Sequence, residues 1–261
     1  GPRGTPTPAS IGFVPLANIP SPARTLLSLD MGHGSLDVPP TVAVVEMATA
    51  SGLALLPPDQ RDLWHTTTVG TGELIRLAAA RPGVTAILLG VGGSATNDLG
   101  LGALEALGVE FLAAGGRRVS PPVPARWPEI VRLGGKLMPG LPPIRIACDV
   151  TNPLLGPRGA AATYGPQKGL RPGDLARLDH EAARLALMLG EKFGRSDDLM
   201  DLPGAGAAGG ISFGLMAAAG AELLRAHEAR LGPWQRARIS GWDLIAELEH
   251  TGLLGRGGAG F

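Results

Sequence analysis

The hydrophobic residues of this chain form short apolar runs that are separated by segments rich in glycine and proline. Several runs are β-branched or continuously apolar, as strands are, at residues 11–14, 41–47, 85–91 and 144–150. Other segments have helical composition or helical spacing of apolar residues, at 72–80, 97–108, 174–189 and 204–224. Because strands alternate with helices, the pattern predicts an α/β fold.

The composition indicates a globular protein with a core of small aliphatic residues. Of the 261 residues, 44% are hydrophobic and only 4% are aromatic, which is enough to bury a sizeable core. The 23 basic and 23 acidic side chains give no net charge, so neither nucleic acid nor an anionic membrane is expected as a partner. One cysteine excludes an intrachain disulfide, and no apolar run reaches the roughly 18 residues of a membrane span. We therefore expect a cytoplasmic protein; its oligomeric state is not predicted.

Three polar or glycine-rich loops adjoin the predicted strands and helices, at residues 92–98, 149–169 and 204–210. In open α/β sheets, the ligand crevice lies beyond the carboxyl ends of the strands. The loops are therefore predicted to converge on one ligand.

The first loop, in the segment GVGGSATND (90–98), predicts an anion site. Its start matches the dinucleotide pattern G-x-G-x-x-A, but the acidic residue expected about 20 positions later is missing. It has neither the Gly-Lys-Ser/Thr of a Walker loop nor the second glycine of a nucleophile elbow. Backbone amides from Gly92 and Gly93, with Ser94 and Thr96, would bind an anion. Asn97 and Asp98 would then hold Mg²⁺ or a hydroxylated substrate, or else one of them only caps the helix.

The other two loops supply charge and further amides. Asp149 closes a predicted buried strand, where a carboxylate is costly unless it binds a cation or accepts hydrogen bonds. Asn152, Gln167 and Lys168 add an oxygen, an amide and a point charge suited to phosphate. The alternative is a solvated lysine beside an ordinary turn. The glycines of 204–210 either expose amides at a helix N-terminus or allow close helix packing.

Six segments, taken in order, resemble the glycerate kinases of the bacterial glyoxylate and glucarate pathways. They are VEMATASGL (45–53), TTTVGTGELI (66–75), GVGGSATND (90–98), CDVTNPLLGPRGA (148–160), YGPQKG (164–169) and PGAGAAGG (203–210). The resemblance implies ATP-dependent phosphorylation of D-glycerate to phosphoglycerate, with Mg²⁺ and ATP as cofactors.

The same resemblance implies a fold and domain boundaries. Residues 1–226 correspond to the family's central domain, a mixed-sheet, three-layer α/β domain likened to restriction-enzyme folds, with 16–40 as an insertion. Segments like the family's PDSFKGSLSA and TGEGRxD are not found, so the flavodoxin-like partner domain is expected to be largely missing. Reduced or absent activity is expected for the same reason.

These motifs lead to a set of expected site residues. Asp149 is expected to act as base or metal ligand, Asp98 as a second metal ligand, and Lys168 as a phosphate contact. The residues expected to line the substrate or nucleotide site are Thr71, Gly92, Gly93, Ser94, Thr96, Asn97, Asn152, Gln167, Gly206 and Gly209. Two other functions remain open: a non-catalytic module that binds an anion or metabolite, and an NAD(P)-binding oxidoreductase.

The C-terminal residues 227–261 form a divergent tail. Its segment ISGWDLIAELEHTGLLGRGGAGF (239–261) resembles the start of the NADH-binding flavoprotein subunit of respiratory complex I. The remainder of that subunit is not found, so the alternative is an amphipathic helix at 243–250 followed by a glycine tail.

Overall fold

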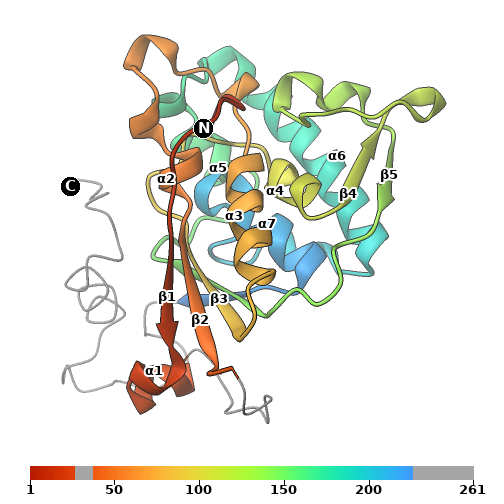
Figure 1. Cartoon of the computed structure of the whole chain (residues 1–261). Helices are drawn as coiled ribbons and strands as arrows, with labels where there is room; N and C mark the ends of the chain where they lie inside the picture. The colour runs from red at the N-terminus through yellow and green to blue at the C-terminus, as the bar shows by residue number, and fades with distance from the viewer. Residues whose placement is uncertain (27–37, 226–261) are drawn as a thin grey trace.

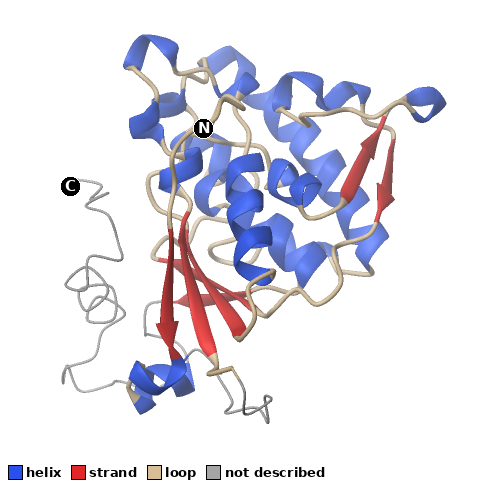
Figure 2. Ribbon diagram, in the orientation of Figure 1, coloured by secondary structure: helices blue, strands red, loops and turns tan. Residues whose placement is uncertain are grey.

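A five-stranded mixed sheet lies at the centre of the fold. The computed structural model describes residues 1–26 and 38–225, so the predicted tail and its helix lie outside the described residues. The strands, red in Figure 2, run in the order β1-β2-β3-β6-β7. Their bounds are Ile11–Pro15, Thr41–Glu46, Val84–Gly90, Ile144–Cys148 and Glu222–Arg225. Strand β1 is antiparallel to β2, and the other neighbours are parallel. The predicted mixed-sheet α/β class is therefore confirmed.

Helices cover the sheet mainly on one side (Figure 1). The α-helices are α1 (Ser21–Leu26), α2 (Ala48–Ser51), α3 (Val69–Ala79), α4 (Leu101–Ala106), α5 (Ala160–Tyr164), α6 (Leu175–Phe193) and α7 (Ala207–Ala219). A second, two-stranded sheet pairs β4 (Val109–Leu112) with β5 (Arg132–Gly135).

Alternating side chains divide the core between the two faces of the sheet. Ala43 and Val45 of β2 belong to the large core, together with buried residues of α3, α4, α6 and α7. Val42 and Val44 face the other way and pack in a smaller cluster with Leu16, Ile19 and Ala23. Helix α1 and the turn before it therefore cover the second face near the lower end of β1 and β2 (Figure 1).

The segment 204–224, predicted as a glycine turn followed by one helix, contains a helix and a strand. Helix α7 ends at Gly220, whose φ of 64° places it in the left-handed region that stops a helix. Residues Glu222–Arg225 then pair in parallel with β6 as the edge strand β7. The single-helix prediction was wrong because strand pairing, a long-range contact, overrides the local helical composition.

Residues 16–40 connect two paired strands. Pro15 lies opposite Thr41 in the antiparallel register of β1 and β2, so the connection leaves and re-enters the sheet at the same end. Its described part holds the 3-10 helix η1 (Leu16–Asn18) and α1. The insertion at 16–40 and the boundary at 226 stay predictions.

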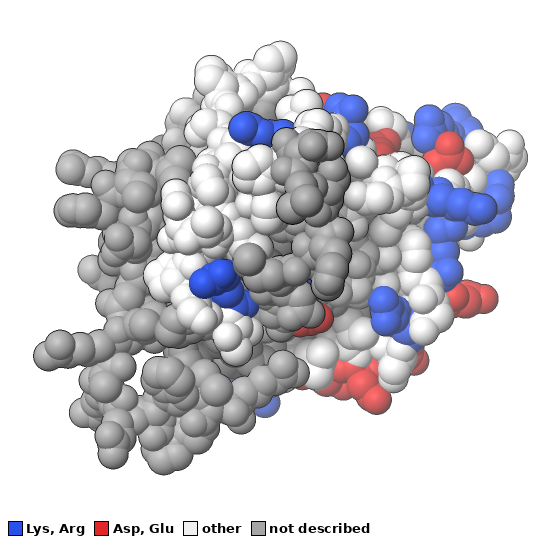
Figure 3. Space-filling model, turned by 60° about the horizontal axis from the view of Figure 1, so that its bottom comes forward, with Lys and Arg blue, Asp and Glu red and all other residues white. Residues whose placement is uncertain are grey.

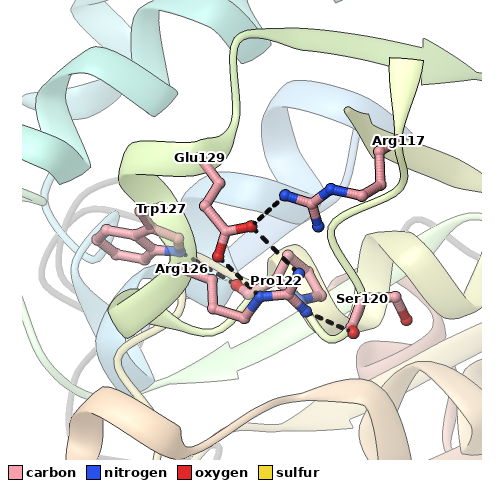
Figure 4. A network of polar contacts seen from close by, with 6 residues as sticks. All are labelled: Arg117, Ser120, Pro122, Arg126, Trp127 and Glu129. Carbon is pink, nitrogen blue, oxygen red and sulfur yellow. Dashed lines mark hydrogen bonds and ion pairs between the residues drawn. The ribbon is translucent and has the colours of Figure 1, made fainter. Parts of the chain in front are cut away.

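A network of polar contacts fixes the segment between β4 and β5 (Figure 4). Arg117 and Arg126 both bind the Glu129 carboxylate, at 2.8 and 3.0 Å, and hold the pKa of Glu129 at about 2. Trp127 is fully buried, and its Nε1–H donates to the Pro122 carbonyl at 3.1 Å. Arg184 of α6 donates to the Trp127 carbonyl at 2.7 Å. These contacts tie the 3-10 helix η6 (Pro124–Glu129) to α6.

Within the described ranges, no helix combines the length and the apolar character needed to cross a membrane. On the face drawn in Figure 3, acidic and basic side chains occur together on the part that is not grey.

Candidate functional site

The three predicted loops meet beyond the carboxyl ends of β2, β3 and β6. The loop after β3 is hydrogen-bonded to residues 47–53, which follow β2. The Leu53 N–H donates to the Gly93 carbonyl at 2.8 Å, and the Ala95 N–H donates to the Ser51 carbonyl at 2.9 Å. The third loop contacts the residue that follows the first loop, since the Leu99 N–H donates to the Gly209 carbonyl at 3.0 Å. The predicted convergence is therefore present, because parallel strands place their carboxyl ends at one edge of the sheet.

Lys168 lies at the centre of this arrangement. It ends the 3-10 helix η7 (Pro166–Lys168), and the residue is only 2% exposed. Its Nζ donates to Ser94 Oγ at 2.8 Å and to the Thr96 carbonyl at 2.7 Å. Burial lowers the pKa of the Lys168 ammonium to about 7, while the Asp98 carboxylate acts in the opposite direction. Because an ammonium has three donors, one N–H remains for another acceptor.

Asp98 is fully buried and ties two helices together. Its carboxylate accepts hydrogen bonds from the N–H and hydroxyl of Thr68, at 2.8 and 2.9 Å, and from the N–H groups of Gly100 and Gly102, at 3.1 and 3.2 Å. Burial raises the pKa of Asp98, and these donors oppose that rise. Thr68 precedes α3 and Gly100 precedes α4. Gly100, and not Asn97 or Asp98, is the N-cap residue of α4, but the Asp98 carboxylate accepts the Gly102 N–H in the first turn of that helix.

Two polar atoms of the first loop lack partners. Thr96 Oγ1 and Asn97 Oδ1 are buried and form no hydrogen bond with any described residue. Their residues are 0% and 2% exposed. Since buried polar atoms are nearly always hydrogen-bonded, these two atoms indicate where a polar ligand would supply what the chain does not.

The strand ends carry two carboxylates in different environments. Asp149 follows β6 and is exposed, so the expected burial of its carboxylate was wrong: the strand ends at Cys148, one residue before it. Glu46 ends β2, and its carboxylate lies against Gly90 at the end of β3. A Cβ at Gly90 would stand 2.7 Å from Glu46 Oε2, so a side chain there would displace the carboxylate. Burial raises the pKa of Glu46, against a smaller opposing effect of the Ala48 N–H.

Asn152 organises the second and third loops. Its Oδ1 accepts a hydrogen bond from the Tyr164 hydroxyl at 2.7 Å, and its Nδ2 donates to Thr163 Oγ1 at 3.1 Å. Its carbonyl accepts the N–H groups of Gly204 and Gly206. Burial, followed by the charge of Asp149, raises the pKa of Tyr164, so Tyr164 and Asp149 are electrostatic neighbours.

The remaining predicted residues fall into two groups. Thr71 is fully buried, and its hydroxyl lies 2.9 Å from Ser51 Oγ. Gly206 and Gly209 use their N–H groups within the protein, on the carbonyls of Asn152 and Gly206. Gly92, Gly93 and Gln167 are exposed at the surface of the loops.

No three side chains of Asp, Glu, His or Cys come together as metal ligands in the ranges 1–26 and 38–225. A Mg²⁺ site that uses one carboxylate together with phosphate oxygens and water does not need three.

A model of the glycerate kinase family matches residues 27–247 of the chain. The chain belongs to the glycerate kinase family. It is 45% identical over 194 residues to the glycerate 2-kinase of Escherichia coli (strain K12), covering 69% of this chain and 47% of that protein. It is 42% identical over 210 residues to the glycerate kinase of Bacillus subtilis (strain 168), covering 78% and 51%.

A solved structure described as glycerate kinase 2, from Salmonella typhimurium LT2, has a similar fold. The TM-score is 0.65 with 39% identity, over 80% of this chain and 52% of that one. The chain spans about half the length of the curated relatives it matches.

Sequence reasoning missed two residues of this candidate site. Glu46 could have been found, because it is the one charged residue at the end of an otherwise apolar strand, the position that Asp149 holds after β6. Thr68 had no local signal, since its contact with Asp98 spans 30 residues. Only the packing of α3 against α4 brings them together.

Replacing Gly209 with alanine is expected to lower the free energy of unfolding by about 3 kcal/mol. The added Cβ would overlap the Thr96 carbonyl and Asn97 Cα, and the φ of +75° already disfavours an L side chain. Chemical denaturation measures the change. Gly173→Ala is the control, since nothing lies within 4 Å of its Cβ position. Equal stability of the two variants would show that the third loop does not pack on the first as described.

Proposed function

We propose that this chain takes part in the phosphorylation of D-glycerate to phosphoglycerate by ATP. The observation that carries the proposal is the buried Lys168 ammonium, which donates to the Thr96 carbonyl of the loop whose Thr96 Oγ1 and Asn97 Oδ1 are unpartnered. A small ligand with hydroxyl and oxyanion groups would supply the missing partners. Membership of the glycerate kinase family and relatives named glycerate kinase favour that ligand class.

Lys168 would bind an oxyanion, either of a phosphoryl group or of the substrate carboxylate. A dianion near its third N–H would favour the charged lysine and raise its lowered pKa. The ammonium would therefore gain charge as the ligand arrives. Stabilising charge in a buried site is the main contribution that a protein makes to phosphoryl transfer.

Asp149 would accept the proton of the attacking hydroxyl. Its carboxylate is exposed at the carboxyl end of β6, and within the described structure no hydrogen bond occupies its oxygens. Tyr164 and Asn152 lie beside it and would fix the loop that carries it.

The alternative role of Asp149 is that of a Mg²⁺ ligand, for which we propose Asp149 rather than Asp98. Asp98 accepts four hydrogen bonds and is fully buried, whereas Mg²⁺ prefers oxygens that it can share with water and phosphate. When bound with ATP, the ion would neutralise phosphate charge.

A cytoplasmic location stays a prediction.

The test is release of ADP in the presence of MgATP and D-glycerate, measured by a coupled assay on the chain. We expect D-glycerate-dependent turnover that is reduced relative to ordinary kinases; a turnover number on the order of 1 to 100 per second would exclude the binding-module alternative. Asp149→Asn is expected to lower kcat/KM at least about tenfold, which corresponds to about 1.4 kcal/mol. Glu191→Gln, an exposed carboxylate on α6, is the control and should keep wild-type turnover.

Two outcomes would contradict the proposal. Unchanged turnover in Asp149→Asn would remove Asp149 from the chemistry. If turnover is absent while D-glycerate or MgATP still raises the melting temperature, the chain is a binding module and the kinase activity is refuted.

A further inference from the structure

A cavity of about 520 Å³ lies outside the polar cluster around Lys168. Arg61 and Trp64 line it from the segment around the 3-10 helix η4 (Leu63–His65), and Ala125 lines it from η6. Gly169, Arg171 and Arg177 line it from the chain between η7 and the first turn of α6. None of the residues assigned above to substrate, phosphate or metal lines this cavity.

The cavity wall carries more positive than negative groups. It includes the guanidinium groups of Arg61, Arg171 and Arg177 and the carboxylates of Asp62 and Asp174. The Asp62 carboxylate is already occupied, since it accepts the Trp64 N–H at 3.1 Å and contacts His65 Nδ1 at 2.7 Å. Two carboxylates therefore face three guanidinium groups, and fewer acceptor positions remain on Asp62 for the arginines.

The arginines themselves have donors to spare. Among residues 1–26 and 38–225, none of the three guanidinium groups forms a hydrogen bond or an ion pair. The Nε of Arg61 is buried and has no acceptor. Leaving a charged donor without an acceptor is costly, so an oxyanion in the cavity would supply what the protein lacks.

Packing holds the wall in place without a ligand. The Arg177 guanidinium stacks 4.8 Å from the centre of the Trp64 ring. Gly169, with a φ of +94°, packs directly on the Arg61 backbone, where a Cβ would overlap the Arg61 carbonyl. The wall that bears Ala125 belongs to η6, which the network of Arg126, Glu129 and Trp127 fixes (Figure 4). A preformed site loses less entropy on binding.

We propose that this cavity binds a small molecule that carries phosphate or carboxylate groups. Its volume falls within the range of small-molecule sites, and the planar guanidinium matches phosphate and carboxylate through paired hydrogen bonds. The proposal concerns a second site and does not depend on the kinase activity.

The test is titration of the whole chain with inorganic phosphate and, separately, with 3-phosphoglycerate, in the absence of ATP and D-glycerate. Calorimetry should show saturable binding at low salt, with a dissociation constant of about a millimolar or less. Arg171→Gln should weaken binding at least about tenfold, and Arg61→Gln similarly. Arg76→Gln is the matched control, because Arg76 is exposed on α3 outside the cavity.

Fluorescence localises the ligand independently. A ligand in the cavity should change the emission of Trp64, and Trp64→Phe should abolish that change while calorimetric binding persists. Tighter binding of 3-phosphoglycerate would identify an organic phosphate as the ligand; equal binding would identify phosphate itself. Either result supports the proposal.

Other results would overturn the proposal and leave the proposed function intact. The first is absence of saturable binding of both probes to the wild-type chain. The second is equal affinity of the Arg61, Arg171 and Arg76 variants. The third is binding that Lys168→Met abolishes and Arg171→Gln leaves unchanged, because the anion would then lie in the Lys168 cluster.

Discussion

Replacing Asp98 with asparagine is expected to lower the free energy of unfolding by about 3 kcal/mol. The carboxylate accepts four hydrogen bonds in a fully buried position. An amide has one carbonyl oxygen, so its NH₂ group would face at least one N–H donor, and the charge that strengthens these bonds is lost. Both Thr68, which precedes α3, and Gly100, which precedes α4, would lose part of their hydrogen bonding.

Urea denaturation followed by circular dichroism measures the effect on Asp98→Asn. Asp149→Asn is the matched control: it makes the same chemical change at an exposed carboxylate and should alter stability by less than about 0.5 kcal/mol. If Asp98→Asn is as stable as this control, the Asp98 contacts do not hold α3 and α4 together. That result would favour a role of Asp98 as a metal ligand over its role in capping the helices.

Replacing Lys168 with methionine is expected to change how stability depends on pH. In the folded protein, burial lowers the pKa of Lys168 to about 7, from the usual lysine value of 10.5. Below pH 7, Lys168 is protonated in both the folded and the unfolded protein, and burial of the charged ammonium lowers the free energy of unfolding. Between pH 7 and 10.5 the unfolded chain binds more protons than the folded one, so the wild-type free energy of unfolding rises with pH, by at most about 1.4 kcal/mol per unit.

The measurement is the difference in unfolding free energy between wild type and Lys168→Met at several values from pH 6 to 10. Taking the difference cancels groups that the two proteins share, such as Cys148 and Tyr164. Lys136→Met, at an exposed lysine, should leave the pH dependence unchanged. If the difference in unfolding free energy does not change between pH 6 and 10, the pKa of Lys168 is not lowered. The ammonium would then be better solvated than its contacts indicate.

Much of the secondary structure followed from local pattern. The apolar runs around β1, β2, β3 and β6 and the helical spacing around α3 and α6 correspond to elements with nearby bounds. Local pattern failed at Glu222–Arg225, where pairing with β6 decides for a strand. It also left β4 and β5 unassigned, because their short antiparallel pairing joins residues far apart in the chain.

The candidate site was predicted in outline and only partly in roles. The three loops were expected to converge, and they do. The spacing of residues did not show that Asp98 faces inward with four donors while Asp149 lies exposed, since both are an aspartate shortly after an apolar strand. Nor did it show the arginine-lined cavity, whose wall joins residues 61–65, 125 and 169–177.

By itself, the sequence determined the α/β class, the order of the main strands and helices, and membership of the glycerate kinase family through six collinear motifs. These properties depend on local periodicity and on residue identity in short segments, which a chain carries in any conformation. Only the tertiary structure decided which polar groups are buried, which have partners, and which arginines share a cavity. Those properties depend on contacts between distant segments, and the same side chain serves as helix cap, ligand contact or solvated charge according to what the fold places beside it.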